Sequence, residues 1–296
     1  PFSLRTSASF APSVDCFVTH TTAATHELLR ANLHRSPLFS GDITGRGPRY
    51  CPSVEDKVVR FAARPRHTVF LEPEGPSSPL VYPAGLSTSL PPDVQLQFLR
   101  TIPGLEHVEV ERYGYAVEYD YAPPTQLLPT LETRAVRWLF FAGQLNGTSG
   151  YEEAAFQGLM AGLNASLQVR ARAPLVLGRD EAHGAVLLDE LVTHGVDEPF
   201  RMFTSRSEHR LKLREGNAPF RLTPHGHRAG LVGDALLAEV EAWRAAVQGE
   251  LGRLETAGLL GQLRRPEVRY ADLAHPALPQ RVQDEVETEA KYAGYI

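Results

Sequence analysis

The stretch AGQLNGTSGYEEAAFQG, from Ala142 to Gly158, decides how the chain is organised. Just ahead of it, the apolar run VRWLFFAG is typical of a buried strand that ends in glycine. After a turn-rich loop, EEAAFQGLMAGLNASL predicts a helix whose small residues allow close packing. A strand, a glycine loop and such a helix form half of a nucleotide-binding α/β unit. We expect backbone amides of the loop and the helix N-terminus to face an anion or a carbonyl oxygen, although a plain strand–helix turn fits the same spacing.

The flanking sequence divides into two further parts. Residues 1–135 predict an α+β domain with an antiparallel sheet, in which TVFLEPEG and HVEVERYGYAVEYDY are strands and DVQLQFLRTI is a helix. Residues 136–168 are the strand, loop and helix described above. Residues 169–296 predict a helical domain, with apolar residues at helical spacing in DALLAEVEAWRAAVQGELGRLETAGLL. The predicted fold class is therefore α/β plus α, and the last helix pattern stops so abruptly that we expect a truncated domain.

Composition excludes several classes of protein. With 43% hydrophobic and 22% charged residues, the 296-residue chain is typical of a soluble globular protein, and no apolar run is long enough to span a bilayer. Two cysteines exclude a disulfide scaffold and a cysteine-rich zinc site, so we expect no metal and a reducing, cytoplasmic location. The net charge of −5 argues against a nucleic-acid coat protein.

Charge is nevertheless distributed unevenly. Residues 201–228 hold seven Lys or Arg and two acids, whereas residues 284–289 hold four acids and no base. A local basic surface can bind phosphates even on an acidic protein, because nearby charges set the local field. No GxGxxG loop follows a strand near the start of the chain. If a dinucleotide is bound, we expect its main phosphate loop to lie outside this chain.

A second motif, GPRYCPSVEDK from Gly47 to Lys57, places Cys51 just before an expected helix. Ser53 is a suitable N-cap for a helix over residues 54–62 that buries Val54, Val58 and Phe61. Free cysteine is usually a buried small hydrophobe, and we expect this for Cys16 within VDCFV.

For Cys51 the surroundings favour the alternative, a reactive thiolate. Its position at the helix start and the neighbouring Arg49 and Lys57 each lower the pKa of a thiol.

Together the two motifs resemble the signatures of the MnmG (GidA) family. The similarity continues through THTTAATHELLRANLHRSPLFSG, GLSTSLPPDVQ and EPFRMFTSRSEHRLKLREGNA. The resemblance implies a flavoprotein subunit that installs a carboxymethylaminomethyl group on the wobble uridine of tRNA. It also implies that residues 1–135 are a domain inserted into a Rossmann-like FAD domain, that residues 136–168 are the returning segment of that FAD domain, and that both ends of the family sequence are missing.

The resemblance assigns roles to particular residues. Cys51 would be the thiolate that adds to C6 of uracil, with Arg49 and Lys57 stabilising the thiolate or the developing oxyanion. Glu55 or Asp56 is a candidate for moving the C5 proton, although both also suit the first turn of a helix. The loop residues that would line the flavin are Gly143, Gln144, Asn146, Gly147 and Thr148. The residues that would contact tRNA phosphates are Arg201, Arg206, Arg210, Lys212 and Arg214, for which a solvated helix face is the simpler alternative.

The resemblance also implies cofactors and partners. These are FAD, NADH as reductant, a folate one-carbon donor supplied through the partner, tRNA, the GTPase MnmE and a homodimer. Two other functions remain open: a tRNA-binding or assembly module without activity of its own, and a folate- and FAD-dependent tRNA uridine-5-methyltransferase. The RYCPSVEDK motif and an expected helix over SRSEHRLKLR argue for the first function over the methyltransferase.

Overall fold

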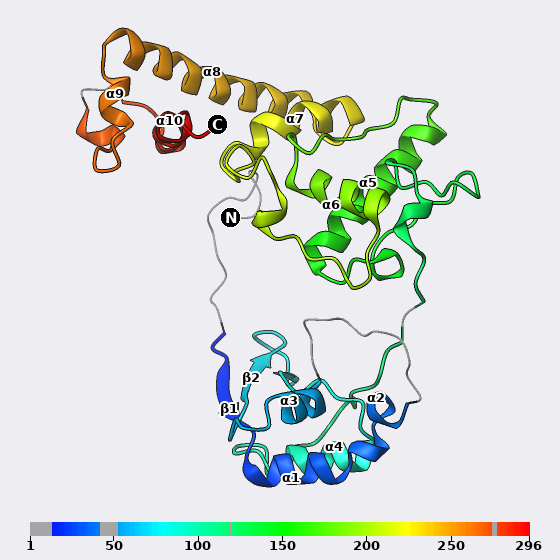
Figure 1. The fold of residues 1–296 in the computed structure, drawn as a ribbon. Helices are drawn as coiled ribbons and strands as arrows, with labels where there is room; N and C mark the ends of the chain where they lie inside the picture. Colours follow the sequence, from blue (N-terminus) through cyan, green and yellow to red (C-terminus); the bar gives the residue numbers. More distant parts are fainter. Residues whose placement is uncertain (1–13, 42–52, 119, 274–276) are drawn as a thin grey trace. The chain divides into compact units, whose positions relative to one another are not determined.

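The structure is a computed structural model that describes residues 14–41, 53–118, 120–273 and 277–296. The chain divides into two compact units, Pro1–Tyr119 and Asp120–Ile296 (Figure 1). Boundaries at residues 135 and 168 stay predictions. Among the described residues, none of the helices combines the length and apolar character needed to cross a membrane.

The first unit contains a three-stranded antiparallel sheet in the order β1-β2-β3. Val69, on the central strand, is fully buried, whereas the next residue, Phe70, is 46% exposed. This alternation is the period of two expected of a sheet with one face on the core. The predicted antiparallel sheet and the strand over TVFLEPEG are confirmed. The strands are β1 (Phe17–His20), β2 (Thr68–Pro73) and β3 (Val81–Ala84).

Two helices of the first unit begin at side-chain caps that the sequence supplies. The Thr22 side chain accepts from the Thr25 backbone N–H in a capping box, and Ser53 Oγ accepts from Asp56 N at 3.1 Å. The helices cover a single apolar core that includes Leu29, Val58 and Phe98. They are α1 (Ala23–Ala31), η1 (Leu33–Arg35), α2 (Pro37–Ser40), α3 (Val54–Arg60) and α4 (Pro92–Leu99).

Three expectations for the first unit were wrong. The segment over residues 107–118 is not a strand, because its backbone is held by a side chain: Gln95 of α4 accepts from Gly114 N and donates to Gly114 O, both at 2.8 Å. Phe61 lies at the C-cap of α3 and is 48% exposed, since the helix ends at Arg60 before it can return that side chain to the core. Cys16 is exposed, one residue before β1 begins.

The second unit is helical. A first core lies between α5 (Tyr151–Val169) and α6 (His183–His194), and a second joins α8 (Asp234–Thr256) to α10 (Gln280–Tyr292) (Figure 1). The helices predicted over residues 152–167 and 234–260 and at the C-terminal end are confirmed. The remaining elements are η2 (Pro124–Gln126), η3 (Gln144–Asn146), η4 (Thr204–Arg206), α7 (Ala218–Ala229), α9 (Leu260–Leu263) and η5 (Tyr270–Asp272).

Two elements expected here do not form. The run VRWLFFAG makes only an isolated bridge between Glu132 and Phe140, and Val136 and Trp138 are more than half exposed. A strand needs a neighbour along its length, and among the described residues only 131–133 pair with this run, through Thr133 N to Leu139 O and Phe141 N to Leu131 O. Likewise, SRSEHRLKLR makes a single 3-10 turn followed by irregular turns rather than a helix. Three of its side chains are held by ion pairs instead: Glu208 with Arg179, Lys212 with Asp180, and Arg214 with α10.

Candidate functional site: the glycine loop and the segment paired with it

The glycine loop, residues 143–150, connects the end of the apolar run to α5. A one-turn 3-10 helix, η3, occupies its first half and ends at Gly147, which has φ +89°. A Cβ on Gly147 would lie 2.8 Å from Val196 Cγ2, so both conformation and space require glycine there. Gly147 O accepts from Phe200 N at 2.8 Å, and Thr148 forms a parallel bridge with Phe200. The loop is therefore tied to a segment more than fifty residues further along the chain.

Gln157 of α5 organises the interior of this loop. Its Oε1 accepts from Gly143 N at 2.7 Å and from Thr148 Oγ1 at 2.8 Å, while its Nε2 donates to Asn146 Oδ1 at 2.7 Å. Asn146 Nδ2 in turn donates to Ala122 O at 2.9 Å. Gln157, Asn146 and Thr148 are fully buried. Each of these buried polar side chains is thus matched to a partner, as burial requires.

This network changes the roles open to the predicted flavin-lining residues. Asn146 and Thr148 direct their side chains at Gln157 and at the backbone, so in this chain they support the loop from inside. The accessible part is Gly143 and Gln144, of which Gln144 is exposed. A Cβ on Gly143 would meet nothing within 4 Å, which leaves open space against the backbone there. The loop therefore leaves room for a ligand at Gly143 and Gln144, and cofactor-lining roles for all five residues stay predictions.

The N-terminus of α5 is occupied by a side chain of the protein. Glu153 is 5% exposed, and its Oε1 accepts from Met202 N at 2.9 Å and lies 3.2 Å from Arg201 Nε. Its Oε2 is buried without a hydrogen-bond partner and would lie 1.8 Å from a Cβ on Gly150. The carboxylate therefore partly neutralises the positive end of the helix dipole that the sequence assigns to a ligand.

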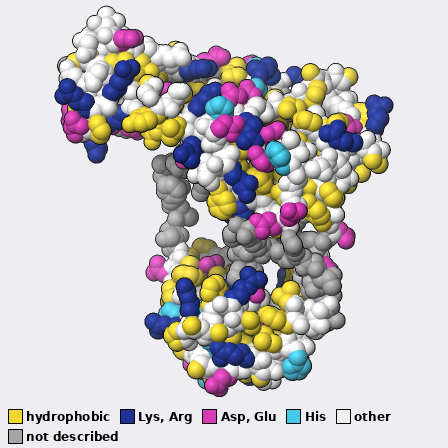
Figure 2. Space-filling view, viewed as in Figure 1, with side chains coloured by type: hydrophobic (Ala, Val, Ile, Leu, Met, Phe, Trp, Pro, Cys, Tyr) yellow, Lys and Arg dark blue, Asp and Glu magenta, His cyan; other side chains and the backbone are white. Residues whose placement is uncertain are grey.

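Of the five predicted phosphate-binding residues, three are committed to partners inside the second unit. Arg201 pairs with Glu153, Lys212 Nζ donates to Asp180 at 2.8 Å, and Arg214, whose side chain is 14% exposed, pairs with Glu285 and Glu289 of α10. The hydrogen bond from Lys212 lowers the pKa of Asp180. Figure 2 accordingly shows basic and acidic side chains interspersed over this unit.

The other two, Arg206 and Arg210, are exposed. The Arg206 guanidinium lies over the ring of Phe200, 4.7 Å from its centroid, so it sits beside the residue that pairs with the glycine loop. The structure thus brings part of the predicted phosphate-binding segment next to the predicted cofactor loop.

Arg179 is a charged group that the sequence analysis missed. Its guanidinium binds both carboxylate oxygens of Glu208, at 2.8 and 2.9 Å, and also reaches Asp189 and Glu190 of α6. These bonds raise the pKa of Arg179 and hold the pKa of Glu208 at about 2. Arg179 therefore links α6 to the segment over residues 200–214, called the basic segment from here on. Four residues spread over thirty positions give no local sequence signal for this cluster.

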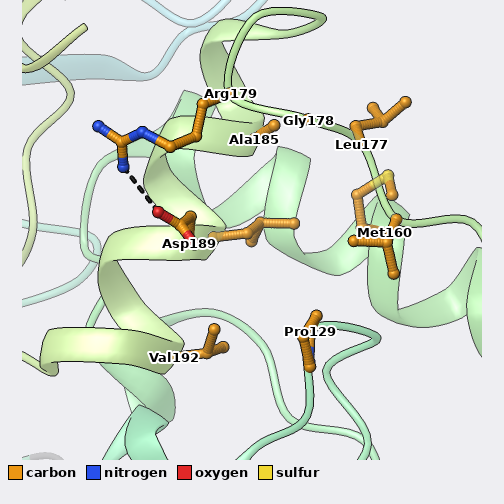
Figure 3. Close-up of a pocket in the computed structure, with 10 residues that line it drawn as sticks. Pro129, Met160, Leu177, Gly178, Arg179, Ala185, Asp189 and Val192 are labelled. Carbon is orange, nitrogen blue, oxygen red and sulfur yellow. Dashed lines mark hydrogen bonds and ion pairs between the residues drawn. The ribbon is translucent and has the colours of Figure 1, made fainter. Parts of the chain in front are cut away.

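A small pocket lies beside Arg179, between α5, α6 and residues 176–179 (Figure 3). Met160, Leu177 and Val192 make it mostly apolar, and the Arg179–Asp189 ion pair closes one side. Its volume of about 130 Å³ is below the roughly 300 Å³ of a small-molecule site. Because the arginine is already paired, the pocket offers no free charge to a ligand.

The cysteine motif lies in the first unit, and the structure describes only its residues from Ser53 onward. Cys51 and Arg49 fall outside the described residues, so their assigned roles stay predictions. Lys57 Nζ donates to Gly85 O at 2.9 Å. Glu55 is fully buried and accepts from Ser89, and Asp56 pairs with Arg60 at 2.8 Å. The proton-transfer role of Glu55 or Asp56 also stays a prediction. Among the described residues, no group of three or more His, Cys, Asp or Glu is placed to hold a metal ion.

Comparisons with known proteins agree with these motifs. Residues 1–173 match the family described as "Glucose inhibited division protein A". Residues 236–296 match the "tRNA modifying enzyme MnmG/GidA C-terminal helical domain". The matches define the class as a GidA-type protein with a helical C-terminal region.

More specifically, the chain belongs to the MnmG/GidA family. The tRNA uridine 5-carboxymethylaminomethyl modification enzyme MnmG of Myxococcus xanthus is 70% identical over 290 residues, covering 96% of this chain and 47% of the relative. The MnmG of Syntrophotalea carbinolica is 52% identical and covers 100% of this chain and 52% of the relative. A solved structure of Aquifex aeolicus GidA superposes with a TM-score of 0.81 at 42% identity, over 96% of this chain and 48% of that one. The chain thus spans about half the length of the relatives it matches.

Proposed function

We propose that this chain is part of an FAD-dependent enzyme that adds the carboxymethylaminomethyl, or aminomethyl, group at C5 of the wobble uridine in tRNA. In this proposal the enzyme is a cytoplasmic homodimer that acts with the GTPase MnmE. Supporting it are the family membership and the names of the relatives, which are tRNA uridine modification enzymes.

A single observation carries the assignment of the site. The glycine loop and the basic segment pair through Gly147, Thr148 and Phe200, and Arg206 stacks on that same Phe200. A cofactor edge at Gly143 and Gln144 would therefore lie near cations able to hold an RNA backbone. Arg206 and Arg210 are the principal phosphate contacts in this proposal. Arg201, Lys212 and Arg214 hold the segment in place through the acids that they already bind.

The proposed chemistry starts from a poor nucleophile, C5 of uracil. The thiolate of Cys51 adds to C6, and the displaced electron pair makes C5 enolate-like and able to attack a one-carbon electrophile. Loss of the C5 proton and expulsion of the thiolate then restore the ring. Arg49 and Lys57 stabilise the thiolate or the developing oxyanion. Bound FAD would supply redox chemistry, with NADH as reductant and a folate as one-carbon donor through the partner.

Flavin absorbance provides the first test. It is measured with and without added FAD, on the 296-residue chain and on a form extended to the length of its relatives. Flavin bound to the extended form supports the proposal. Tight tRNA binding without flavin in either form would instead favour a tRNA-binding or assembly module. Transfer of a simple methyl group to uridine would favour the methyltransferase.

The roles of the cysteine and of the basic segment have separate tests. In the active extended form, Cys51→Ala should abolish modification of tRNA, and full turnover would remove Cys51 from the mechanism. Charge reversal at Arg206 and Arg210 should weaken tRNA binding and reduce the slope of its salt dependence by about one for each phosphate that is no longer bound. An unchanged salt dependence would show that the phosphates lie elsewhere.

A further inference from the structure

Gln157 is a polar side chain of the second unit that makes three hydrogen bonds to the candidate cofactor loop. It is fully buried on α5, and its three hydrogen bonds reach Gly143, Asn146 and Thr148, at the beginning, middle and later part of the loop. The loop also makes bonds of its own, from Asn146 N and Thr148 N to Gly143 O. Gln157 thus adds a link that comes from a rigid helix rather than from the loop itself.

The direction of these bonds explains why an amide is used. Oε1 accepts from two donors, whereas Nε2 donates to Asn146 Oδ1. A carboxylate at this position would keep both acceptor bonds but would face the Asn146 oxygen without a proton to share. Rotating the Asn146 amide to face the carboxylate with its NH₂ group would break the hydrogen bond from Asn146 Nδ2 to Ala122 O, so this rearrangement has a cost.

We propose that Gln157 is a positioning residue for the flavin site: it holds the backbone of Gly143 and Gln144 in the geometry that receives the cofactor. This inference rests on the proposed function. Groups that bind a cofactor must be held in place by a supporting layer of hydrogen bonds, because ordering a loose loop at the moment of binding reduces affinity. Gln157 does not itself touch the cofactor in this arrangement.

Asn164 provides a matched control on the same helix. It lies seven residues after Gln157, on the same face, and is 2% exposed. Its side chain also makes three hydrogen bonds, but these go to Thr130 O, Leu175 O and Leu175 N, away from the glycine loop. Removing either amide should destabilise the fold to a similar degree. Removing Gln157 alone should disturb the loop.

The experiment compares Gln157→Met, Gln157→Glu and Asn164→Leu in the extended form of the protein. FAD affinity is measured by fluorescence titration of the apoprotein, the flavin environment by its visible absorption spectrum, and loop order by hydrogen exchange of the Gly143 amide. We expect Gln157→Met to weaken FAD binding by about tenfold or more, to change the spectrum and to speed exchange at Gly143. Gln157→Glu should fall between Gln157→Met and wild type, and Asn164→Leu should bind FAD as wild type does.

The outcomes separate this inference from the proposed function. Equal FAD affinity and equal spectra for Gln157→Met and Asn164→Leu would overturn the positioning role while leaving the flavin site intact. If Gln157→Met fails to fold, Gln157→Glu decides, and wild-type affinity with wild-type exchange at Gly143 would overturn the role. A wild-type protein that binds no flavin would overturn the proposed function and this inference with it.

Discussion

At the scale of single residues, the start of α5 depends on space as much as on charge. Gly150 has an ordinary extended backbone, with φ −74°, so its conformation alone does not require glycine. What requires it is Glu153, whose Oε2 occupies the position of a Cβ on Gly150. The same carboxylate accepts from Met202 and pairs with Arg201. One missing methyl group therefore allows the contact between α5 and the basic segment.

We predict that Gly150→Ala displaces the Glu153 carboxylate from both partners. Met202 N and the buried carboxylate then lose their hydrogen bond, which should lower the free energy of unfolding by about 1–3 kcal/mol. Urea-induced unfolding measures the change. Gly252→Ala is the control, because Gly252 is exposed on α8 with nothing within 4 Å of its added Cβ. There alanine should stabilise the protein by about 0.5–1 kcal/mol. Equal effects of the two substitutions would show that Glu153 moves aside without cost.

At the scale of elements, helices with strong local signals were predicted correctly. Ser53 caps α3 as expected, and α5 begins one residue before and ends two residues after the helix predicted over residues 152–167. The failures were segments whose state depends on distant partners. Residues 107–118 are held by the Gln95 side chain instead of a strand, and SRSEHRLKLR is fixed by ion pairs such as Arg179–Glu208 instead of helical bonds. Nothing local in the sequence encodes such partners.

In the candidate site, too, features with a local sequence signal were predicted and features that depend on distant residues were not. The glycine spacing alone marks residues 142–158, which include Gln157, as a candidate site. The sequence does not predict the role of Gln157, because a glutamine side chain can face solvent, the core or a loop. Only the structure shows that Asn146 and Thr148 turn toward it. The pairing of the loop with Phe200 could not be predicted without the fold, since all of α5 and α6 lies between them in the sequence.

The contact of α1 with the residue before β2 should be sensitive to acid. His26 and His67 are buried with ring centroids 5.2 Å apart, and His67 Nε2 has no hydrogen-bond partner. Burial lowers the pKa of both histidines. The charge of Arg30 lowers the pKa of His26 further, and His26, Lys57 and Arg64 do the same to the pKa of His67. Because the folded pKa values lie below the unfolded value of 6.5, this contribution to stability is complete above 6.5 and is lost as pH falls toward the folded values.

We therefore predict that the free energy of unfolding decreases between about pH 7.5 and about pH 5.5. His67→Leu removes one of the two titrating rings together with its unpartnered nitrogen, so its loss of stability over this range should be smaller than that of wild type. Urea unfolding at the two pH values provides the comparison. His34→Gln, at an exposed histidine in η1, should keep the wild-type dependence. A wild-type dependence in His67→Leu would assign the acid sensitivity to other groups.

At the scale of the whole chain, one arginine links the basic segment to the C-terminal helix α10 within the second unit. Arg214 is the last residue of the basic segment, and its guanidinium pairs with Glu285 and Glu289 of α10 and lies 5.3 Å from the ring centroid of Tyr292. Burial raises the pKa of Glu285, which shows how poorly the site tolerates its charge. The residue expected to contact phosphates thus connects the segment to the helical region matched by the family's C-terminal domain.

Arg214→Met should leave two neighbouring carboxylates without their cation. Breaking a buried pair in this way costs about 3–5 kcal/mol, because the remaining charges stay desolvated. Fluorescence of Trp243, which lies in the same apolar cluster as Val286 of α10, should report the loss during urea unfolding. Lys291→Met is the control: it removes a more exposed i,i+4 pair with Glu287 on the same helix and should cost about 0.5 kcal/mol.

The pH dependence of this variant tests the cause as well as the size of the loss. An acid whose folded pKa is raised binds protons more tightly in the folded state, so stability increases as pH falls toward that pKa. The deficit of Arg214→Met should therefore shrink in mild acid, where the buried carboxyl of Glu285 becomes protonated. Adding Glu285→Gln to Arg214→Met should recover part of the stability at neutral pH for the same reason. A deficit that is constant with pH, or a double variant no better than the single one, would instead point to weaker packing against Tyr292 as the source of the effect.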